Sequence, residues 1–167
     1  MQFAELKNRL LTTRDLRQNR LDDIIRVTDN TLLQLALNIP GEQKCPPGVD
    51  CLMQWANEQL RASFQHLLQL HEETDSLGPW AIYMTPVAAK DAKRRCCLIE
   101  QSHPFARLLD IDVYSTHGQS IDRQLLGIEQ RCCLVCAEDA KECIRTQRHT
   151  GKMIDDCMQQ LLESVPA

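Results

Sequence analysis

The sequence predicts an α+β fold in which a mixed sheet of about four to five strands packs against helices. Short apolar stretches bounded by glycine, proline and polar residues indicate the strands, and longer stretches with apolar residues every three or four positions indicate the helices. With 167 residues the chain is expected to form a single domain, 1–167, that ends in a helical segment containing cysteine and histidine at about 131–167.

The N-terminal region predicts two helices. Residues 2–12 form a short first helix, and Thr13 is placed as the N-cap of a second helix at 14–27. The apolar stripe of this second helix, continued backwards by helical spacing, reaches Arg17 and Arg14. Because cations at a helix N-terminus oppose the helix dipole, we expect an anion to bind there.

The remaining elements follow from apolar runs and from breaks at glycine and proline. They are a strand at 31–39, a loop at 40–50, a long helix capped by Asp50 and reaching about residue 71, strands at 80–87, 94–101 and 108–115, and an amphipathic C-terminal helix at 150–165.

Composition narrows the class of protein. Hydrophobic residues make up 43% and charged residues 25%, which is ordinary for a globular protein, and the net charge of −4 disfavours nucleic-acid binding. The N-terminus lacks an apolar signal region and no run approaches membrane-spanning length, so we expect a cytoplasmic protein without membrane contact. In a reducing cytoplasm, nine cysteines indicate buried thiols, a metal site, or both.

Two aspartates in the strand at 108–115 are the leading functional candidates. Asp110 and Asp112 are spaced for one face of a strand, where two carboxylates repel unless a cation joins them. We predict an Mg²⁺ site at these two carboxylates. Arg107 and His103 lie just upstream, and cations next to acids favour a site that binds both a phosphate and a metal. The alternative is a solvent-facing strand edge.

Three cations are candidates for phosphate binding. Arg14 and Arg17 lie one helical turn apart, and arginine forks match phosphate oxygens. Lys44 lies in the glycine-containing loop "NIPGEQKCPPG", which is not a Walker A motif. The alternative for the arginines is a solvated helix face.

The stretch at 133–149 has the spacing C-x2-C-x6-C-x5-H. Cys133, Cys136, Cys143 and His149 would complete a closed tetrahedral Zn²⁺ site. The alternative is a set of free cysteines, with Cys133 and Cys136 in the core.

Four stretches, in order along nearly the whole chain, match the pattern of a known family: "LLTTRDLRQNR" (10–20), "LNIPGEQK" (37–44), "IEQSHPFARLLDIDV" (99–113) and "RCCLVCAEDAKECIRTQRH" (131–149). Together they resemble the apo-citrate lyase phosphoribosyl-dephospho-CoA transferase family, also called holo-citrate lyase synthase or holo-ACP synthase of citrate lyase. The last two stretches are the most specific.

The resemblance implies a nucleotidyltransferase-type reaction. The donor would be 2'-(5''-triphosphoribosyl)-3'-dephospho-CoA and the acceptor a serine of the apo acyl carrier protein, the gamma subunit of citrate lyase, with diphosphate released. Asp110 and Asp112 would hold Mg²⁺, while Arg14, Arg17 and Lys44 would grip the triphosphate. His103 would either assist deprotonation of the serine or shape the loop. By analogy, the acid pair suggests a polymerase-β-like nucleotidyltransferase fold.

Two positions depart from the family pattern as we expect it: Ala106 stands where glycine is usual, and Trp80 where glutamate is common. Two other functions remain open, namely an Mg²⁺-dependent nucleotidyltransferase with another donor or acceptor, and a zinc-stabilised binding module. Four basic residues would supply a docking patch for an acidic carrier protein: Lys90, Lys93, Arg94 and Arg95.

Overall fold

A computed structural model describes residues 2–166 and confirms the α+β class. In chain order its elements are α1 (Gln2–Ile25), β1 (Thr31–Leu37), α2 (Val49–Ser63), β2 (Leu68–Asp75), β3 (Gly78–Thr85), α3 (Ala89–Gln101), the 3-10 helix η1 (Phe105–Leu108), β4 (Leu109–Tyr114), the 3-10 helix η2 (Gln124–Leu126), α4 (Ala140–Arg145) and α5 (Gly151–Glu163). No helix within residues 2–166 is both long and apolar enough to span a membrane.

The sheet has four strands in the order β2-β3-β1-β4. Every neighbouring pair is antiparallel, so the expectation of a mixed sheet is wrong. The two-residue turn between β2 and β3 can join only antiparallel strands. From β3, α3 carries the chain across β1, and β4 then pairs with the other edge of β1. The polymerase-β-like fold stays a prediction.

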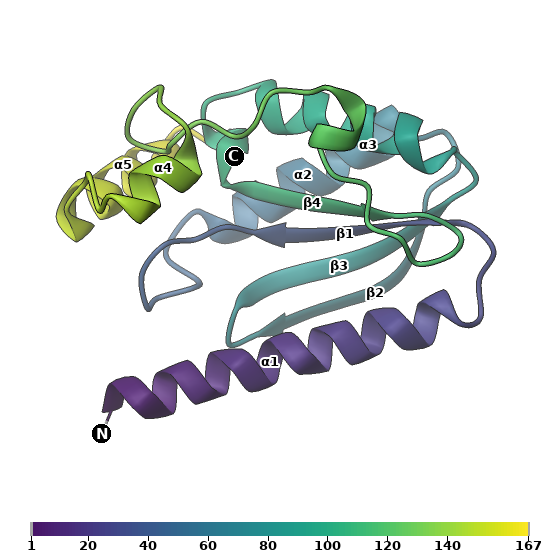
Figure 1. The fold of residues 1–167 in the computed structure, drawn as a ribbon, viewed down its shortest axis with the longest axis horizontal. Helices are drawn as coiled ribbons and strands as arrows, with labels where there is room; N and C mark the ends of the chain where they lie inside the picture. Colours follow the sequence, from purple (N-terminus) through teal and green to yellow (C-terminus); the bar gives the residue numbers. More distant parts are fainter. Residues whose placement is uncertain (1, 167) are drawn as a thin grey trace.

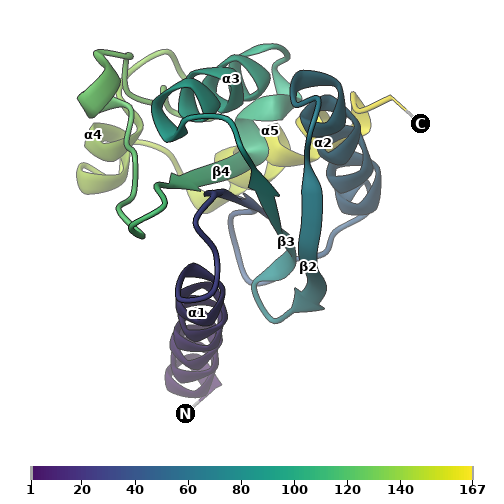
Figure 2. The same ribbon diagram turned by 90° about the vertical axis from the view of Figure 1, so that its right-hand side faces the viewer.

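Helices cover the two faces of the sheet unequally. Figure 1 shows α2 and α3 on one face and α1 along the other, and Figure 2 shows α1 standing apart from the remaining helices. The face under α2 and α3 carries the main core, to which β1 contributes Leu33, Leu35 and Leu37. The α1 face has a smaller cluster around Leu21 and Trp80. This second face is therefore only partly covered.

The first helix is one continuous element and not two. Thr13, predicted as an N-cap, lies inside α1, where its hydroxyl donates to the carbonyl oxygen of Arg9 at 3.0 Å. A threonine hydroxyl can bond to the preceding turn in this way without ending the helix. Arg14 and Arg17 therefore lie mid-helix, and the expected N-terminal anion site is absent from this part of the described chain.

The long helix predicted to reach residue 71 ends at Ser63. Its apolar spacing continues through Phe64 and Leu68, but Phe64 is extended, with φ −126° and ψ 108°, and Leu68 begins β2. The cap also differs, because Gly48 and not Asp50 occupies the N-cap position. From Leu68 onward the chain forms cross-strand hydrogen bonds to β3 and is a strand, not a helix. Sequence spacing within this segment does not reveal that pairing.

The strand predicted at 94–101 is wrong, because these residues belong to α3. The buried residues of α3 include Ala92, Cys96 and Ile99, which recur at helical spacing, while Leu98 is 68% exposed. The other predicted strands are confirmed as β1, β3 and β4, and α5 confirms the C-terminal helix, with Thr150 as its N-cap.

Candidate functional site

Asp110 and Asp112 lie on one face of β4, as their spacing predicts. Their neighbours Leu109, Ile111 and Val113 are fully buried in the main core, so both aspartates point to the α1 face. In the antiparallel register with β1, Asp110 pairs with Ala36 and Asp112 with Gln34. Both carboxylates are half-buried on the part of this face that α1 leaves open.

The acid pair is electrostatically unfavourable without a cation. Burial and then the charge of Asp110 raise the pKa of Asp112, although the positive charges of Lys93 and Arg131 act in the opposite direction. Asp110 accepts a hydrogen bond from Arg131 at 2.9 Å. Two carboxylates on adjacent same-face positions of a strand supply the oxygen ligands that Mg²⁺ prefers.

A buried glutamate connects the acid pair to the interior. Glu100 of α3 is 3% exposed and accepts from Arg123 at 2.5 Å and from Arg131 at 2.6 Å. Arg131 also donates to the carbonyl oxygen of Leu109 at 2.6 Å. Arg131 thus joins Glu100, Asp110 and the backbone at the start of β4.

Sequence reasoning missed Glu100, Arg123 and Arg131 as members of this network. Glu100 and Arg131 both lie in the two stretches that most specifically resemble the transferase family, 99–113 and 131–149. Their positions in those stretches could have marked them as candidates. The pairing of their charges depends on the contact between α3, β4 and a distant loop, which the sequence does not reveal.

The outer edge of β4 is bonded by side chains of α3. Lys93 donates to the carbonyl oxygen of Ile111 at 2.7 Å, and Glu100 accepts from the Ile111 N–H at 2.9 Å. An otherwise open edge of the sheet is thereby satisfied. Lys93 is 5% exposed, so its expected place in a basic docking patch is wrong. Lys90, Arg94 and Arg95 are exposed on α3.

Arg14 and Lys44, from distant parts of the chain, interact through their charges. Lys44 donates to the carbonyl oxygen of Ile39 at 2.6 Å, and burial followed by the charge of Arg14 lowers its pKa. Arg14 is exposed on α1. Two interacting cations repel each other, and an anion bound by both would relieve that repulsion.

Arg17 has partners that account for its burial. Its guanidinium makes a two-pronged contact with Asp75, at 2.7 and 2.6 Å, and donates to the carbonyl oxygen of Gly78 at 2.8 Å. It also lies over the ring of Trp80 at 4.9 Å. These contacts hold α1 against the turn between β2 and β3. Phosphate binding by Arg17 stays a prediction.

Arg107 and His103 lie at the entrance of β4. Arg107 donates to the backbone carbonyl oxygens of Cys132 and Cys133. His103 is exposed, its ring stacks on Phe105 with centroids 5.0 Å apart, and its Nδ1 lies 3.0 Å from the Ser102 hydroxyl. Both residues line the cavity described next, and no contact joins either of them to the acid pair in residues 2–166.

A cavity of about 1300 Å³ lies between the start of β4 and the C-terminal segment, and residues of both line it. Its wall combines cations with cysteine and apolar side chains. Cavity-lining residues from both sides include Arg107, Arg123, Arg131, Arg148, Leu134 and Ile154. This volume suits a large anionic ligand with apolar parts.

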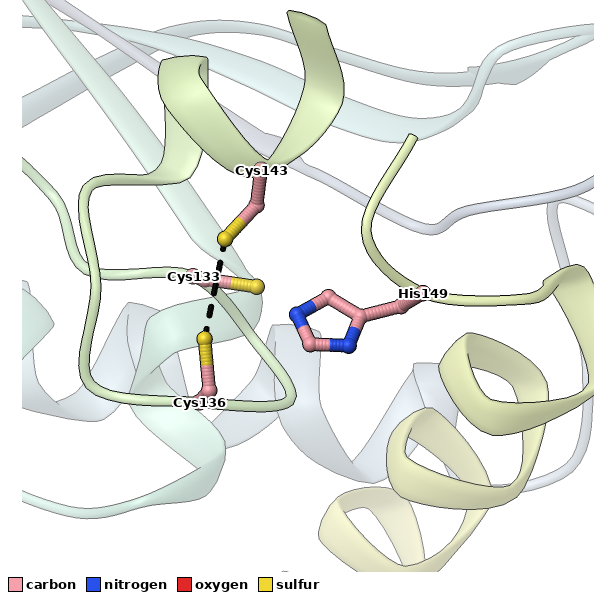
Figure 3. Close-up of side chains that lie close together, drawn as sticks. All are labelled: Cys133, Cys136, Cys143 and His149. Carbon is pink, nitrogen blue, oxygen red and sulfur yellow. Dashed lines mark hydrogen bonds between the residues drawn. The ribbon is translucent and has the colours of Figure 1, made fainter. Parts of the chain in front are cut away.

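The four predicted zinc ligands converge at this cavity (Figure 3). The sulfur atoms of Cys133, Cys136 and Cys143 and a ring nitrogen of His149 all lie within 4.8 Å of one another. Burial works against ionisation of Cys133, yet backbone N–H groups of Cys136 and Val135 bond to its sulfur and lower its pKa. The structure thus brings together residues spread over 133–149.

The two departures from the family pattern have different consequences. Ala106 is fully buried in η1, and Gln147 is the one non-glycine residue with positive φ among residues 2–166. The backbone at Ala106 therefore has no positive φ that would require glycine. Trp80 is 2% exposed and lies on the same cross-strand row as Ala36 and Asp110, two strands or about 10 Å from that aspartate.

Comparisons with known proteins extend the agreement to the whole chain. The sequence model of the family described as apo-citrate lyase phosphoribosyl-dephospho-CoA transferase matches residues 6–165. The protein CitXG of Haemophilus influenzae is 33% identical over 159 residues, which cover 93% of this chain and 34% of that protein. The chain likewise spans 26% of CitXG from Leuconostoc mesenteroides, so it corresponds to a part of these longer relatives.

Relatives of similar length carry the transferase name. Apo-citrate lyase phosphoribosyl-dephospho-CoA transferase of Escherichia coli O139:H28 is 28% identical over 162 residues, which cover 95% of this chain and 88% of that protein. A probable transferase of the same name from Vibrio cholerae serotype O1 is 26% identical over 148 residues, 86% and 83% of the two chains. Because the family match includes the acid pair, the arginine network and the cysteine cluster, the chain belongs to the apo-citrate lyase phosphoribosyl-dephospho-CoA transferase family.

Proposed function

We propose that this chain transfers a phosphoribosyl-dephospho-CoA group to the apo acyl carrier protein of citrate lyase. The observation that carries the proposal is the family match over residues 6–165. Relatives of nearly the same length bear the name of this transferase, which supports the proposal.

The chemistry requires one bond to form and one to break. The hydroxyl oxygen of the carrier's serine attacks the donor phosphorus that bears the ribose, forming a phosphodiester. The bond from that phosphorus to the outer two phosphates breaks, and diphosphate leaves while the serine proton passes to a base or to water. Positioning and charge neutralisation dominate such a transfer.

The acid pair is the proposed metal site. Asp110 and Asp112 supply carboxylate oxygens on one face of β4, in a place where neither is fully solvated. An Mg²⁺ ion bound there would neutralise charge on the attacked phosphate and on the departing diphosphate. Arg131, held by Glu100, fixes the Asp110 carboxylate at 2.9 Å and so sets the geometry of the pair.

Anionic parts of the donor have two cationic regions available. The charges of Arg14 and Lys44 repel, and neither side chain has an anionic partner among the contacts of the described residues. We propose that the triphosphate joins them. Arg107 and His103 line the large cavity, where we place the dephospho-CoA portion. The polar and apolar parts of that group match the mixed wall. We further propose a cytoplasmic location, since none of the nine cysteines forms a disulfide.

Intact mass spectrometry of the apo carrier protein tests the transfer. The carrier is incubated with this protein, the triphosphoribosyl donor and Mg²⁺. We expect a mass gain equal to the donor minus diphosphate, which disappears with EDTA. Asp112→Asn should abolish it without lowering stability, because the substitution removes a metal ligand and also relieves repulsion from Asp110.

Asp29→Asn is the matched control. Asp29 is exposed and precedes β1, at the end of the sheet away from Asp110, so its loss should leave the mass gain intact. A mass gain that survives in Asp112→Asn would remove the acid pair from the mechanism. Failure with this donor but success with another nucleotide donor would favour a related nucleotidyltransferase. Failure with every donor would favour a binding module.

A further inference from the structure

We propose that Cys133, Cys136, Cys143 and His149 bind one structural Zn²⁺ ion, and that this ion fixes the cavity wall that carries Arg131. The site goes beyond the proposed transfer and does not depend on it. Four protein ligands would fill the tetrahedral shell of the metal, which leaves no position for substrate or water and makes the site structural.

The ligand atoms have the separations that zinc requires. With Zn–S bonds of about 2.3 Å, sulfurs at two corners of a tetrahedron lie roughly 3.8 Å apart. The Sγ atoms of Cys136 and Cys143 are 3.6 Å apart, and all four ligand atoms lie within 4.8 Å of one another. Three sulfurs with one imidazole are a donor set that favours zinc over magnesium or calcium.

His149 supplies an independent indication of a missing partner. Its Nε2 is buried and has no hydrogen-bond partner among residues 2–166. Figure 3 shows the ring directed at the three sulfurs. A buried imidazole nitrogen without a partner is costly, whereas the same nitrogen bound to a metal is satisfied.

The backbone around the cluster forms a hairpin followed by a short helix. The N–H of Cys133 donates to the carbonyl oxygen of Glu138 at 2.7 Å, and the N–H of Ala140 donates to that of Arg131 at 3.0 Å. The side chain of Asp139 then caps α4, which presents Cys143. The hairpin turn holds the first two ligands and α4 holds the third.

This segment lacks a hydrophobic core of its own. Between residues 131 and 150, the buried side chains are those of Cys133 and Cys143, and Ile144 is 77% exposed. A six-residue helix is too short to be stable alone. Small units with so little apolar burial depend on a disulfide or a metal, and a metal bound by these four residues would supply the cross-link.

The same hairpin positions the arginine network of the acid pair. Arg131 lies two residues before Cys133 and reaches Asp110 and Glu100. Arg107 holds the hairpin from the other side through the carbonyl oxygens of Cys132 and Cys133. Because the hairpin carries Arg131, loss of the metal should release this cation from Asp110 while leaving the sheet folded.

Metal analysis of the full chain tests the site directly. Protein purified from zinc-containing medium without chelator should carry close to one zinc per chain. Cys136→Ser and Cys143→Ser should each lose most of it. Cys132→Ser and Cys157→Ser should keep it, because Cys132 is exposed beside the hairpin and Cys157 donates to the Leu134 carbonyl oxygen, a bond that serine also makes.

Cobalt replacement and hydrogen exchange provide readouts that do not rely on variants. Co²⁺ added to zinc-free wild-type protein should produce the intense visible absorption of a tetrahedral thiolate site. Removing zinc should abolish amide protection in residues 131–150 while β1 and β3 remain protected. An absent cobalt spectrum, or unchanged protection after zinc removal, would overturn the proposal. So would metal-free protein with a reducible Cys136–Cys143 disulfide.

Discussion

Substituting Glu100 by glutamine isolates the buried charge that organises the site. The change keeps the shape of the side chain, and the amide oxygen still accepts from the Ile111 N–H, so the backbone bond at 2.9 Å survives. What disappears is the negative charge opposite Arg123 and Arg131.

The expected cost follows from the burial of each partner. The Glu100 side chain is 1% exposed and that of Arg123 is 9%, so Arg123 would remain as a buried cation without a carboxylate, with the Glu129 carbonyl oxygen at 3.2 Å still available. Removing one partner of a buried pair costs about 3–5 kcal/mol. Arg131 is 29% exposed and keeps Asp110, so it adds little.

This loss is large for a domain of this size. Stabilities of about 5–15 kcal/mol are typical, and each 1 kcal/mol lowers Tm by roughly 2–4 °C, so we expect Tm to fall by about 6–20 °C. The assay is urea unfolding of Glu100→Gln against wild type. Glu58→Gln is the control, because Glu58 is exposed and its hydrogen-bond partner, Gln54, is an exposed neighbour on the same helix.

A midpoint shift equivalent to less than about 1 kcal/mol, at unchanged denaturant slope, would refute the reasoning. It would mean that the charge of Glu100 contributes no more than a solvent-exposed ion pair.

Two further predictions concern α1 and the core. Arg17→Ala should lower the free energy of unfolding in urea by about 3–5 kcal/mol, because it leaves the Asp75 carboxylate, 16% exposed, without its partner. Arg14 is exposed, so Arg14→Ala should change that free energy by no more than about 0.5 kcal/mol while weakening donor binding. A stable Arg17→Ala protein with weakened donor affinity would instead assign Arg17 to the phosphates. Burial raises the pKa of Tyr83 from 10.0 to about 12, so the unfolded state loses this proton first and stability should fall as pH rises from 10 towards 12. Tyr83→Phe should remove that part of the fall, and an identical decline in both proteins, measured by unfolding at each pH, would contradict the assignment.

Local pattern was sufficient for the central strands and for the C-terminal helix. β1, β3 and β4 are short apolar runs between breaks, and α5 has a threonine cap before an amphipathic repeat. The placement of Asp110 and Asp112 on one face follows from strand periodicity alone. The spacing of the four cysteine and histidine residues similarly indicated a cluster, because all four lie within 17 consecutive positions, 133–149.

Long-range contacts decided the remainder. Helical spacing continues past Ser63, but pairing with β3 makes Leu68–Asp75 a strand, and packing on β4 makes Ala89–Gln101 a helix. Arg17 pairs with Asp75, which lies 58 residues away in the sequence, and Arg131 pairs with Asp110, which lies 21 residues away. Sequence spacing fixes which side chains share a face within one element. Which charges meet between elements depends on how those elements pack, and only the tertiary structure specifies that.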